Sequence, residues 1–280
     1  MGLKEQLRDT LPGQALSSLS DRFDIIGKIA VLSLPEALTP YRHVIADAVI
    51  SRRRTIMTVL NKVSRLEGSN RTAVYEILAG SDTVTIHKEY DFSYRLDVST
   101  VFYNPRLASE RQRVTCQVCS GELVLVPFCG VGPFVIPTAA HGATVVAVEQ
   151  NPEACRWLRE NVVLNGVEDQ VTLIIGDAFD TSRLPAGAFD RAIIPTPYGM
   201  DAIFDLIAPL VKPGGMIHSY IFCTRDQADA RGEGFARSGF DCIVQRRCGN
   251  VAPGISRWVY DLRKRLPSIP GAENNDCRDC

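Results

Sequence analysis

Two glycines that follow a short apolar run constrain this chain more than any other feature. The run Leu123–Phe128 is rich in valine and bounded by glycines, which favours a buried parallel strand over a helix. The turn Cys129-Gly130-Val131-Gly132-Pro133-Phe134 follows it and leads into a helix-like segment. A second run with β-branched residues, Thr144–Val148, ends on the acid Glu149. This order predicts a βαβ unit with two parallel strands and therefore an α/β fold.

The spacing of these residues is that of a nucleoside site. Gly130 precedes Glu149 by the interval of about 20 residues found in nucleotide-binding βαβ units. Glycines let the backbone approach a ligand, and a carboxylate at the next strand end can accept hydrogen bonds from both ribose hydroxyls. A third strand, Gln170–Ile175, ends in Gly176-Asp177, where the acid is expected to meet an adenine edge. Because the third glycine of G-x-G-x-x-G is missing, we predict S-adenosylmethionine (SAM) as the cofactor. An NAD site and an empty Rossmann-like unit are the alternatives.

Length and composition exclude several other classes of protein. The 280 residues fit one large domain or two small ones. No apolar run approaches the roughly 18 residues of a membrane span, and the charged N-terminus lacks the apolar segment of a secretory signal. We therefore expect a cytoplasmic protein whose nine cysteines are reduced thiols or metal ligands. The net charge of −1 argues against wholesale electrostatic binding of nucleic acid but is compatible with a local basic face.

The segments before the glycine turn predict a small α+β domain over residues 21–105. Residues 1–20 are polar and are expected to form a loose tail or a short helix. A β-hairpin is expected over Phe23–Leu34 and a helix over Ala37–Arg53. Four further strands are expected over Thr58–Val63, Ala73–Leu78, Thr83–Lys88 and Phe92–Val98.

Residues 106–265 predict a Rossmann-like domain with a doubly wound, mostly parallel sheet. Its further helices are expected over Ser109–Cys119, Asp201–Leu210 and Gln227–Ser238. Its further strands are expected over Arg191–Ile194, Met216–Cys223, and an antiparallel pair, Asp241–Asn250 and Ser256–Leu262. Residues 266–280 are rich in Pro, Gly, Asn and Asp and are expected to be disordered.

The chain resembles the archaeal and eukaryotic tRNA methyltransferases that modify N1 of guanine 37, next to the anticodon. The matching segments run through nearly all of residues 21–220, and the most specific are YNPRLASER at Tyr103–Arg111 and GVGPF at Gly130–Phe134. The resemblance implies SAM-dependent methyl transfer to tRNA. A sister family transfers an aminocarboxypropyl group from SAM in wybutosine synthesis. It has a different phrase at Asn104-Pro105-Arg106 and an aromatic at Pro133, so at both places this chain is more similar to the methyltransferases.

Two positions depart from the family pattern. The family has an aspartate near the end of the first strand, where this chain has Val126. It also has Asn-Leu-Pro after the fourth strand, where this chain has Pro195-Thr196-Pro197-Tyr198. That asparagine is held to position the target base, and a proline cannot replace its donors and acceptor. The extra N-terminal domain with which many relatives grip the tRNA elbow is not expected here. Aminocarboxypropyl transfer, a non-tRNA acceptor and a non-catalytic binding module therefore remain alternatives.

Guanine N1 carries a proton, so its methylation needs a base and stabilisation of charge at O6. Glu110 is the family-matched candidate base, and Arg71 is the candidate for O6. The alternative for Glu110 is a solvated helix acid that pairs with a neighbouring arginine. The alternative for Arg71 is a surface loop residue. Arg106 is a candidate for binding phosphate or for bracing the junction between the domains.

The remaining candidate contacts lie at strand ends. Pro197 and Tyr198 are candidate substrate contacts, because a tyrosine ring can stack on a flipped base; a rigid turn is the alternative. The candidate cofactor contacts are Phe128, Gly130, Gly132, Pro133, Glu149, Gln150, Asp177, Ala178 and Pro195.

Other motifs carry weaker signals. A basic face for RNA, or a solvated helix end, is expected from Arg52–Arg54, Lys62, Arg65 and Arg71. The pairs Cys116-x-x-Cys119 and Cys277-x-x-Cys280 have the spacing of zinc ligands, but they lie far apart in sequence, so we predict no metal site. Cys129 is expected to be a small packed residue, and His218 is expected to be structural.

Overall fold

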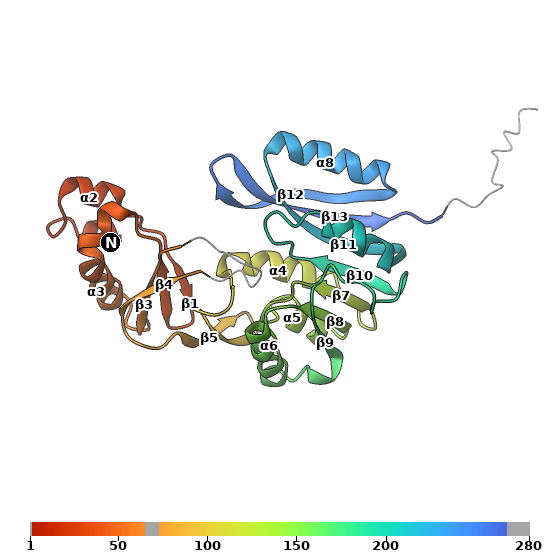
Figure 1. The fold of residues 1–280 in the computed structure, drawn as a ribbon, viewed down its shortest axis with the longest axis horizontal. Coiled ribbons are helices and arrows are strands. Elements are labelled where there is room, and N and C mark those ends of the chain that lie inside the picture. Colours follow the sequence, from red (N-terminus) through yellow and green to blue (C-terminus); the bar gives the residue numbers. More distant parts are fainter. Residues whose placement is uncertain (1, 65–72, 268–280) are drawn as a thin grey trace, which may run out of the picture. The chain divides into compact units, whose positions relative to one another are not determined.

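A computed structural model describes residues 2–64 and 73–267 of the chain (Figure 1). The chain divides into two compact units, Met1–Asp180 and Thr181–Cys280, and each is described by itself. The predicted domain boundaries, after residues 20, 105 and 265, are not the division between these units and stay predictions. Among the described residues, no helix has the length and apolar character needed to cross a bilayer.

The first unit contains a four-stranded sheet in the order β1-β2-β3-β4. Its strands are β1 (Asp24–Ile26), β2 (Ile29–Leu32), β3 (Thr58–Lys62) and β4 (Tyr75–Ala79), with η1 (Glu36–Tyr41) and α3 (Arg42–Arg52) between β2 and β3. β1 and β2 pair antiparallel, as the predicted hairpin requires. Their turn contains Gly27 at φ +56°, and a Cβ there would lie 2.2 Å from Thr85 Oγ1. Glycine is therefore needed for this turn to pack against β5 (Val84–Glu89).

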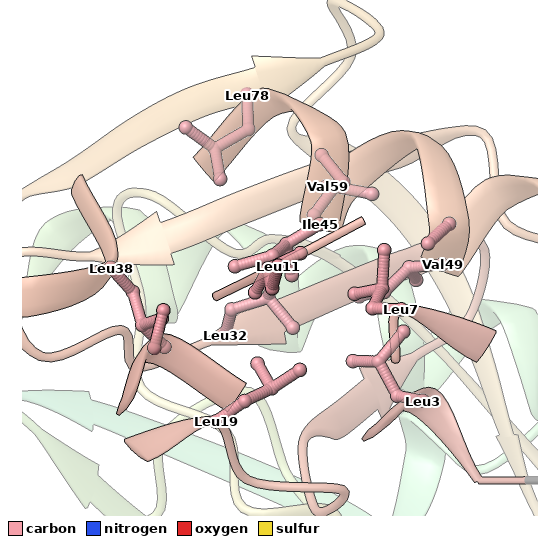
Figure 2. Close-up of a cluster of buried hydrophobic side chains, with 14 of the residues drawn as sticks. Leu3, Leu7, Leu11, Leu19, Leu32, Leu38, Ile45, Val49, Val59 and Leu78 are labelled. Carbon is pink, nitrogen blue, oxygen red and sulfur yellow. The ribbon is translucent and has the colours of Figure 1, made fainter. Parts of the chain in front are cut away.

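The first 20 residues are a structured part of this unit. They form α1 (Leu3–Gln6) and α2 (Gly13–Ser18), so the short-helix alternative is closer to the structure than the loose tail. Leu3, Leu7 and Leu11 recur every four residues and are buried against α3, β2 and β3. Figure 2 shows these leucines pointing toward Ile45, Val49 and Val59 in one apolar cluster. The polar residues between these leucines are the reason that a loose tail was one of the two predictions for this stretch.

A buried ionic network joins the hairpin of β5 and β6 (Phe92–Asp97) to α4 (Ala108–Thr115). Glu89 accepts a hydrogen bond from Arg111 Nε at 2.7 Å and another from the Tyr103 hydroxyl at 2.7 Å. Both charged side chains are at most 5% exposed. Nearby, burial lowers the pKa of His87, which suits the neutral ring whose Nδ1 accepts a hydrogen bond from Gly27 N at 3.1 Å. α4 ends at Thr115, four residues before the predicted Cys119.

The three strands predicted around the glycine turn are present and parallel in the order β7-β8-β9. They are β7 (Leu123–Pro127), β8 (Thr144–Glu149) and β9 (Val171–Ile175), with α5 (Val135–Ala140), α6 (Pro152–Leu164) and η3 (Glu168–Gln170) in the connections. α6 starts on an Asn151 cap, whose Oδ1 accepts from Glu153 N at 3.0 Å, and on Pro152 at its first position. Its inner face buries Trp157 and Leu158.

The second unit contains four strands in the order β12-β13-β11-β10. They are β10 (Phe189–Ile194), β11 (Val211–Cys223), β12 (Phe240–Ala252) and β13 (Ile255–Lys264); the helices are α7 (Ile203–Ile207), η4 (Ala208–Leu210) and α8 (Arg225–Arg237). β10 and β11 are parallel, whereas the long β12–β13 pair is antiparallel as predicted. β11 starts before the predicted Met216, because Pro213-Gly214-Gly215 lies inside it with a register shift opposite β10.

His218 lies at the centre of a buried polar row across β10, β11 and β13. Its Nδ1 is 2.7 Å from Asp261 Oδ1, and its Nε2 is 2.7 Å from Arg191 Nη1. All three side chains are at most 5% exposed. Buried polar groups of this kind hold strands in register, which agrees with the structural role expected for His218.

Candidate cofactor and substrate site

The turn after β7 exposes its backbone where the predicted site requires it. Phe128, Gly130 and Gly132 all have positive φ, at +53°, +56° and +96°. A Cβ added to Gly130 would meet nothing within 4 Å, so the backbone there faces open space. A Cβ on Gly132 would instead lie 2.5 Å from Leu158 Cδ1 of α6. Gly130 thus leaves room for a ligand, and Gly132 lets the turn pack on the helix.

Glu149 at the end of β8 binds this turn directly. Its Oε2 accepts a hydrogen bond from Gly130 N at 2.8 Å, and its Oε1 accepts from Gln150 N at 3.0 Å and Asn151 N at 2.9 Å. A carboxylate has about four lone-pair positions, so three backbone donors leave little capacity for a ligand. Glu149 was expected to accept hydrogen bonds from both ribose hydroxyls. In this arrangement the carboxylate mainly holds the turn and has room for about one such bond.

The end of β9 lies beside the same turn. Gly176 N donates to Glu149 O at 2.9 Å, which brings Asp177 next to β8. Asp177 Oδ1 accepts from Phe179 N at 3.0 Å, and the rings of Phe179 and Phe128 meet edge to face at 6.2 Å. Phe128, Gly130, Glu149 and Asp177 are therefore brought together at the carboxyl ends of parallel strands, where α/β proteins bind their ligands.

The thiols beside the turn are not nucleophiles. Cys129 is 2% exposed, and burial, together with the Glu149 carboxylate, raises its pKa well above the ordinary thiol value. Burial also raises the pKa of Cys155 to about 11. Both are protonated at neutral pH, as expected for small packed residues.

Glu110 is buried on the first turn of α4, with 3% of its side chain exposed. Its Oε1 accepts from Arg113 Nη2 at 2.8 Å, one helical turn away. The carboxylate is thus paired with a neighbouring arginine, as one alternative anticipated, but it is not solvated. Arg71, the candidate for O6, lies outside the described residues.

Arg106 connects η2 (Pro105–Leu107) to the small sheet. Its Nε donates to Asp24 Oδ1 of β1 at 2.6 Å, while 63% of its side chain stays exposed. It borders an open groove of about 490 Å³ that Arg22, Arg52 and Arg53 also line. The contact with Asp24 joins η2 to β1, and both roles expected for Arg106 stay predictions.

The segment after β10 belongs to the second unit and forms a tight turn. Met200 N donates to Pro197 O at 3.1 Å, and Thr196 Oγ1 donates to Ile194 O at 3.2 Å. Pro195 begins this turn. Tyr198 is 55% exposed, and its ring lies 5.5 Å from that of Phe222 on β11. These two hydrogen bonds hold the turn, which displays an aromatic ring to solvent.

Sequence analysis did not identify two asparagines that hold the elements around the site: Asn161 on α6, and Asn165, which directly follows the helix. Asn161 Nδ2 donates to Val131 O of the glycine turn at 3.1 Å and to Arg95 O of β6 at 3.0 Å. Asn165 Nδ2 donates to Ser93 O of β6 at 2.8 Å. The available signal was an amide on the buried face of an amphipathic helix, where a polar side chain must have a specific partner.

The described residues contain no group of three or more side chains arranged to hold a metal ion. Cys116 and Cys119 are both exposed free thiols. Cys277 and Cys280, the other pair with zinc-ligand spacing, lie outside the described residues.

Alanine at Gly132 is expected to reduce mainly the stability of the protein, whereas alanine at Gly130 is expected to reduce mainly its affinity for SAM. Gly132→Ala should lower the free energy of unfolding by about 1–3 kcal/mol, because its Cβ overlaps Leu158. Gly130→Ala should cost only the left-handed backbone strain, about 1–2 kcal/mol, and instead weaken ligand binding by filling the open space. Chemical denaturation and calorimetric titration with SAM measure the two effects separately. Equal SAM affinity in Gly130→Ala and the wild type would contradict the site.

Comparisons with known proteins identify the family of this chain. The model of the TRM5/TYW2 methyltransferase domain matches residues 85–233, and that of the TYW2 N-terminal domain matches residues 3–83. The tRNA (guanine(37)-N(1))-methyltransferase Trm5b of Pyrococcus abyssi is 37% identical over 213 residues, 76% of this chain and 63% of its own. The chain therefore spans less than two thirds of that relative.

Two further comparisons cover nearly the whole chain. The tRNA(Phe) (4-demethylwyosine(37)-C(7)) aminocarboxypropyltransferase of Pyrococcus horikoshii is 37% identical over 270 residues, 93% of this chain and 95% of its own. The crystal structure of P. horikoshii TYW2 in complex with MeSAdo has a TM-score of 0.75 at 29% identity and covers 93% of this chain and 97% of that one. These matches confirm the predicted Rossmann-like domain preceded by a small α+β domain. The chain belongs to the TRM5/TYW2 methyltransferase family.

Proposed function

We propose that this protein is a SAM-dependent methyltransferase that modifies tRNA at N1 of guanine 37 or at a related base near the anticodon. The observation that carries the proposal is the bond from Gly130 N to Glu149, which fixes an open glycine turn beside the acids of two strand ends. The name of the P. abyssi relative supplies the acceptor. A tRNA acceptor also supports the cytoplasmic location expected from the sequence.

The residues at this turn fit SAM. Open space at Gly130 suits the close approach of a nucleoside, Glu149 holds the turn and keeps about one lone-pair position for a ribose hydroxyl, and Asp177 supplies an acceptor for the base. Phe128, Gly132, Pro133, Gln150 and Ala178 complete the proposed contacts in the first unit, and Pro195 is the proposed contact from the second. When bound, SAM supplies a methyl group activated by its sulfonium charge.

Glu110 is the proposed base for the acceptor. With SAM bound, the Glu110 carboxylate would accept the proton that guanine N1 loses when it receives the methyl group, and S-adenosylhomocysteine would be the second product. Burial excludes water from Glu110, and Arg113 orients it through a charge-assisted bond. The Arg71 role at O6 rests on the family resemblance alone. Tyr198 supports binding of a flipped base, since its exposed ring can stack.

The basic groove beside Arg106 is the proposed contact for the tRNA backbone in the first unit. Arg22, Arg52, Arg53 and Arg106 line it, and Asp21 and Asp24 moderate its charge. Exposed guanidinium groups suit phosphate oxygens, and such contacts weaken steeply with salt.

Aminocarboxypropyl transfer is the second candidate, and a specific observation favours it. The TYW2 N-terminal domain model matches residues 3–83, and the P. horikoshii aminocarboxypropyltransferase aligns with 93% of this chain. The same site would serve that reaction with a different carbon of SAM facing the acceptor.

Two labelled donors distinguish these candidates. Bulk tRNA is incubated with the protein and with SAM labelled in the methyl group or in the carboxyl group. Methyl label alone on tRNA supports methyl transfer, and carboxyl label alone supports aminocarboxypropyl transfer. Neither label on tRNA, with SAM still bound, would contradict both.

Glu110→Gln is expected to slow the transfer step by about 100-fold or more, because the amide cannot accept the N1 proton. SAM affinity should stay within about twofold of the wild type. Glu153→Gln is the matched control, since Glu153 also pairs with an arginine three residues away but is 48% exposed. Single-turnover transfer measures both variants, and an unchanged rate in Glu110→Gln would remove Glu110 as the base.

A further inference from the structure

The β12–β13 hairpin and the start of α8 enclose a groove that the proposed reaction does not use. Its volume is about 800 Å³, within the range of ligand-binding clefts. The lining residues are Arg225, Arg247, Asn250, Val251, Ala252, Pro253, Gly254, Ser256 and Trp258, and no acidic residue is among them.

The groove combines exposed positive charge with an aromatic ring. Arg247 and Trp258 are paired across the two strands and therefore share one face. Arg225, at the first position of α8, approaches that face from the helix side. Both arginines are exposed, and within residues 2–64 and 73–267 neither forms an ion pair. Their charge is thus available to a ligand.

The wider hairpin carries the same charge. Residues 245–258 include Arg246, Arg247 and Arg257 and no aspartate or glutamate, although the whole chain has a net charge of −1. A basic strand pair in a nearly neutral protein points to an anionic partner.

The indole N–H of Trp258 is a hydrogen-bond donor without an acceptor among the described residues. Its Nε1 atom is enclosed by the protein. Buried donors are nearly always paired, so an unpaired indole N–H at a groove wall needs an explanation. A ligand with acceptor oxygens, bound with a movement of the indole, would supply the missing partner.

The opposite face of the hairpin leads to Tyr198, the proposed contact for the acceptor base in the second unit. Successive residues of a strand point to opposite faces, so Arg257 lies on the face away from Trp258. The Arg257 guanidinium lies 4.9 Å from the centre of the Phe222 ring, which contacts Tyr198. An extended ligand that crosses the tip of the hairpin at Pro253-Gly254 would contact both faces of the hairpin.

We propose that this groove binds a single-stranded segment of the substrate RNA, next to the nucleotide that is modified. Arg225 and Arg247 bind its phosphates, and a base packs on Trp258. The inference rests on the proposed function, because it takes RNA as the substrate. Aromatic stacking with a positively charged groove is the way in which proteins hold single strands without reading their sequence.

Salt-dependent tRNA binding tests the groove. The double variant Arg225→Ala/Arg247→Ala is compared with Arg237→Ala/Arg263→Ala, which also removes one arginine from α8 and one from the hairpin. The Arg237 side chain is 72% exposed at the far end of α8, and Arg263 is exposed near the end of β13. The groove variant should bind tRNA about tenfold more weakly than the control. Its salt slope should fall by about 1.4, since each single-strand phosphate contact contributes about 0.7.

The outcomes distinguish this inference from the proposed function. Calorimetry with SAM should give equal affinity in both variants and the wild type, which excludes misfolding. If the wild type binds tRNA and the groove variant matches the control, the groove proposal is wrong while the proposed function stands. If the wild type does not bind tRNA, the proposed function and the groove proposal both fail.

Tryptophan fluorescence provides a second readout. The chain has two tryptophans, so Trp157→Phe leaves Trp258 as the sole emitter. A single-stranded oligonucleotide should quench this emission in the Trp157→Phe variant, and Arg225→Ala/Arg247→Ala should shift the quenching curve about tenfold to higher concentration. Quenching by a polyglutamate peptide but not by the oligonucleotide would overturn the RNA assignment in favour of a protein partner.

Discussion

Glu149→Ala is expected to lower SAM affinity by about 100-fold or more. The substitution removes the acceptor for Gly130 N, Gln150 N and Asn151 N together with any bond to the ligand. Hydrogen bonds to a charged group contribute about 1.5–3 kcal/mol each, and about 2.7 kcal/mol corresponds to 100-fold. Calorimetric titration with SAM measures the loss.

Two further variants test whether the loss of SAM affinity comes from the carboxylate of Glu149. Glu149→Gln keeps one acceptor oxygen but turns an NH₂ group toward backbone donors, so it should recover only part of the affinity. Glu153→Ala, which removes an exposed acid in the first turn of α6, should leave SAM binding as in the wild type. Affinity within about threefold of the wild type in Glu149→Ala would contradict the role given to this carboxylate.

Glu89→Ala is expected to lower the free energy of unfolding by about 3–5 kcal/mol. Arg111 would then be a buried cation without its partner, and such uncompensated charges are strongly destabilising. The hydroxyl of Tyr103 would lose its acceptor as well. Chemical denaturation measures the change, and a loss below about 1 kcal/mol would show that the pair is not a main stabilising contact.

The same pair should behave differently when both charges are removed. Glu89→Leu/Arg111→Met should recover much of the lost stability, because apolar replacement of a buried ion pair is often neutral. Glu160→Ala is the matched control: its contacts with Arg95 and Arg156 are exposed, so it should cost about 1 kcal/mol or less. Since Arg111 is adjacent to Glu110 on α4, Glu89→Ala should also slow transfer in the protein that remains folded.

The parts of the fold that follow from local pattern could be predicted from the sequence. β7, β8 and β9 are short apolar runs, and the glycine turn and Glu149 are separated by the interval of a nucleotide-binding unit. Hairpins also emerge from local signals, as with β1–β2 and β12–β13. In each case the residues that determine the element lie within it or next to it.

The contacts that the sequence could not provide join residues far apart in the chain. Glu89 and Arg111 read separately as ordinary charged residues, and only the packing of α4 on the β5–β6 hairpin buries both. Asn161 reads as a polar position on α6 until Val131 O and Arg95 O are brought to it. The groove between Arg225, Arg247 and Trp258 requires the register of two strands and the position of a helix.

The most direct test of this account is a calorimetric titration of the folded wild-type protein with SAM and with S-adenosylhomocysteine. The arrangement of Gly130, Glu149 and Asp177 predicts saturable heat and one site per chain for both compounds. The absence of heat with either compound, on protein that unfolds cooperatively, would contradict the cofactor site and every function proposed from it.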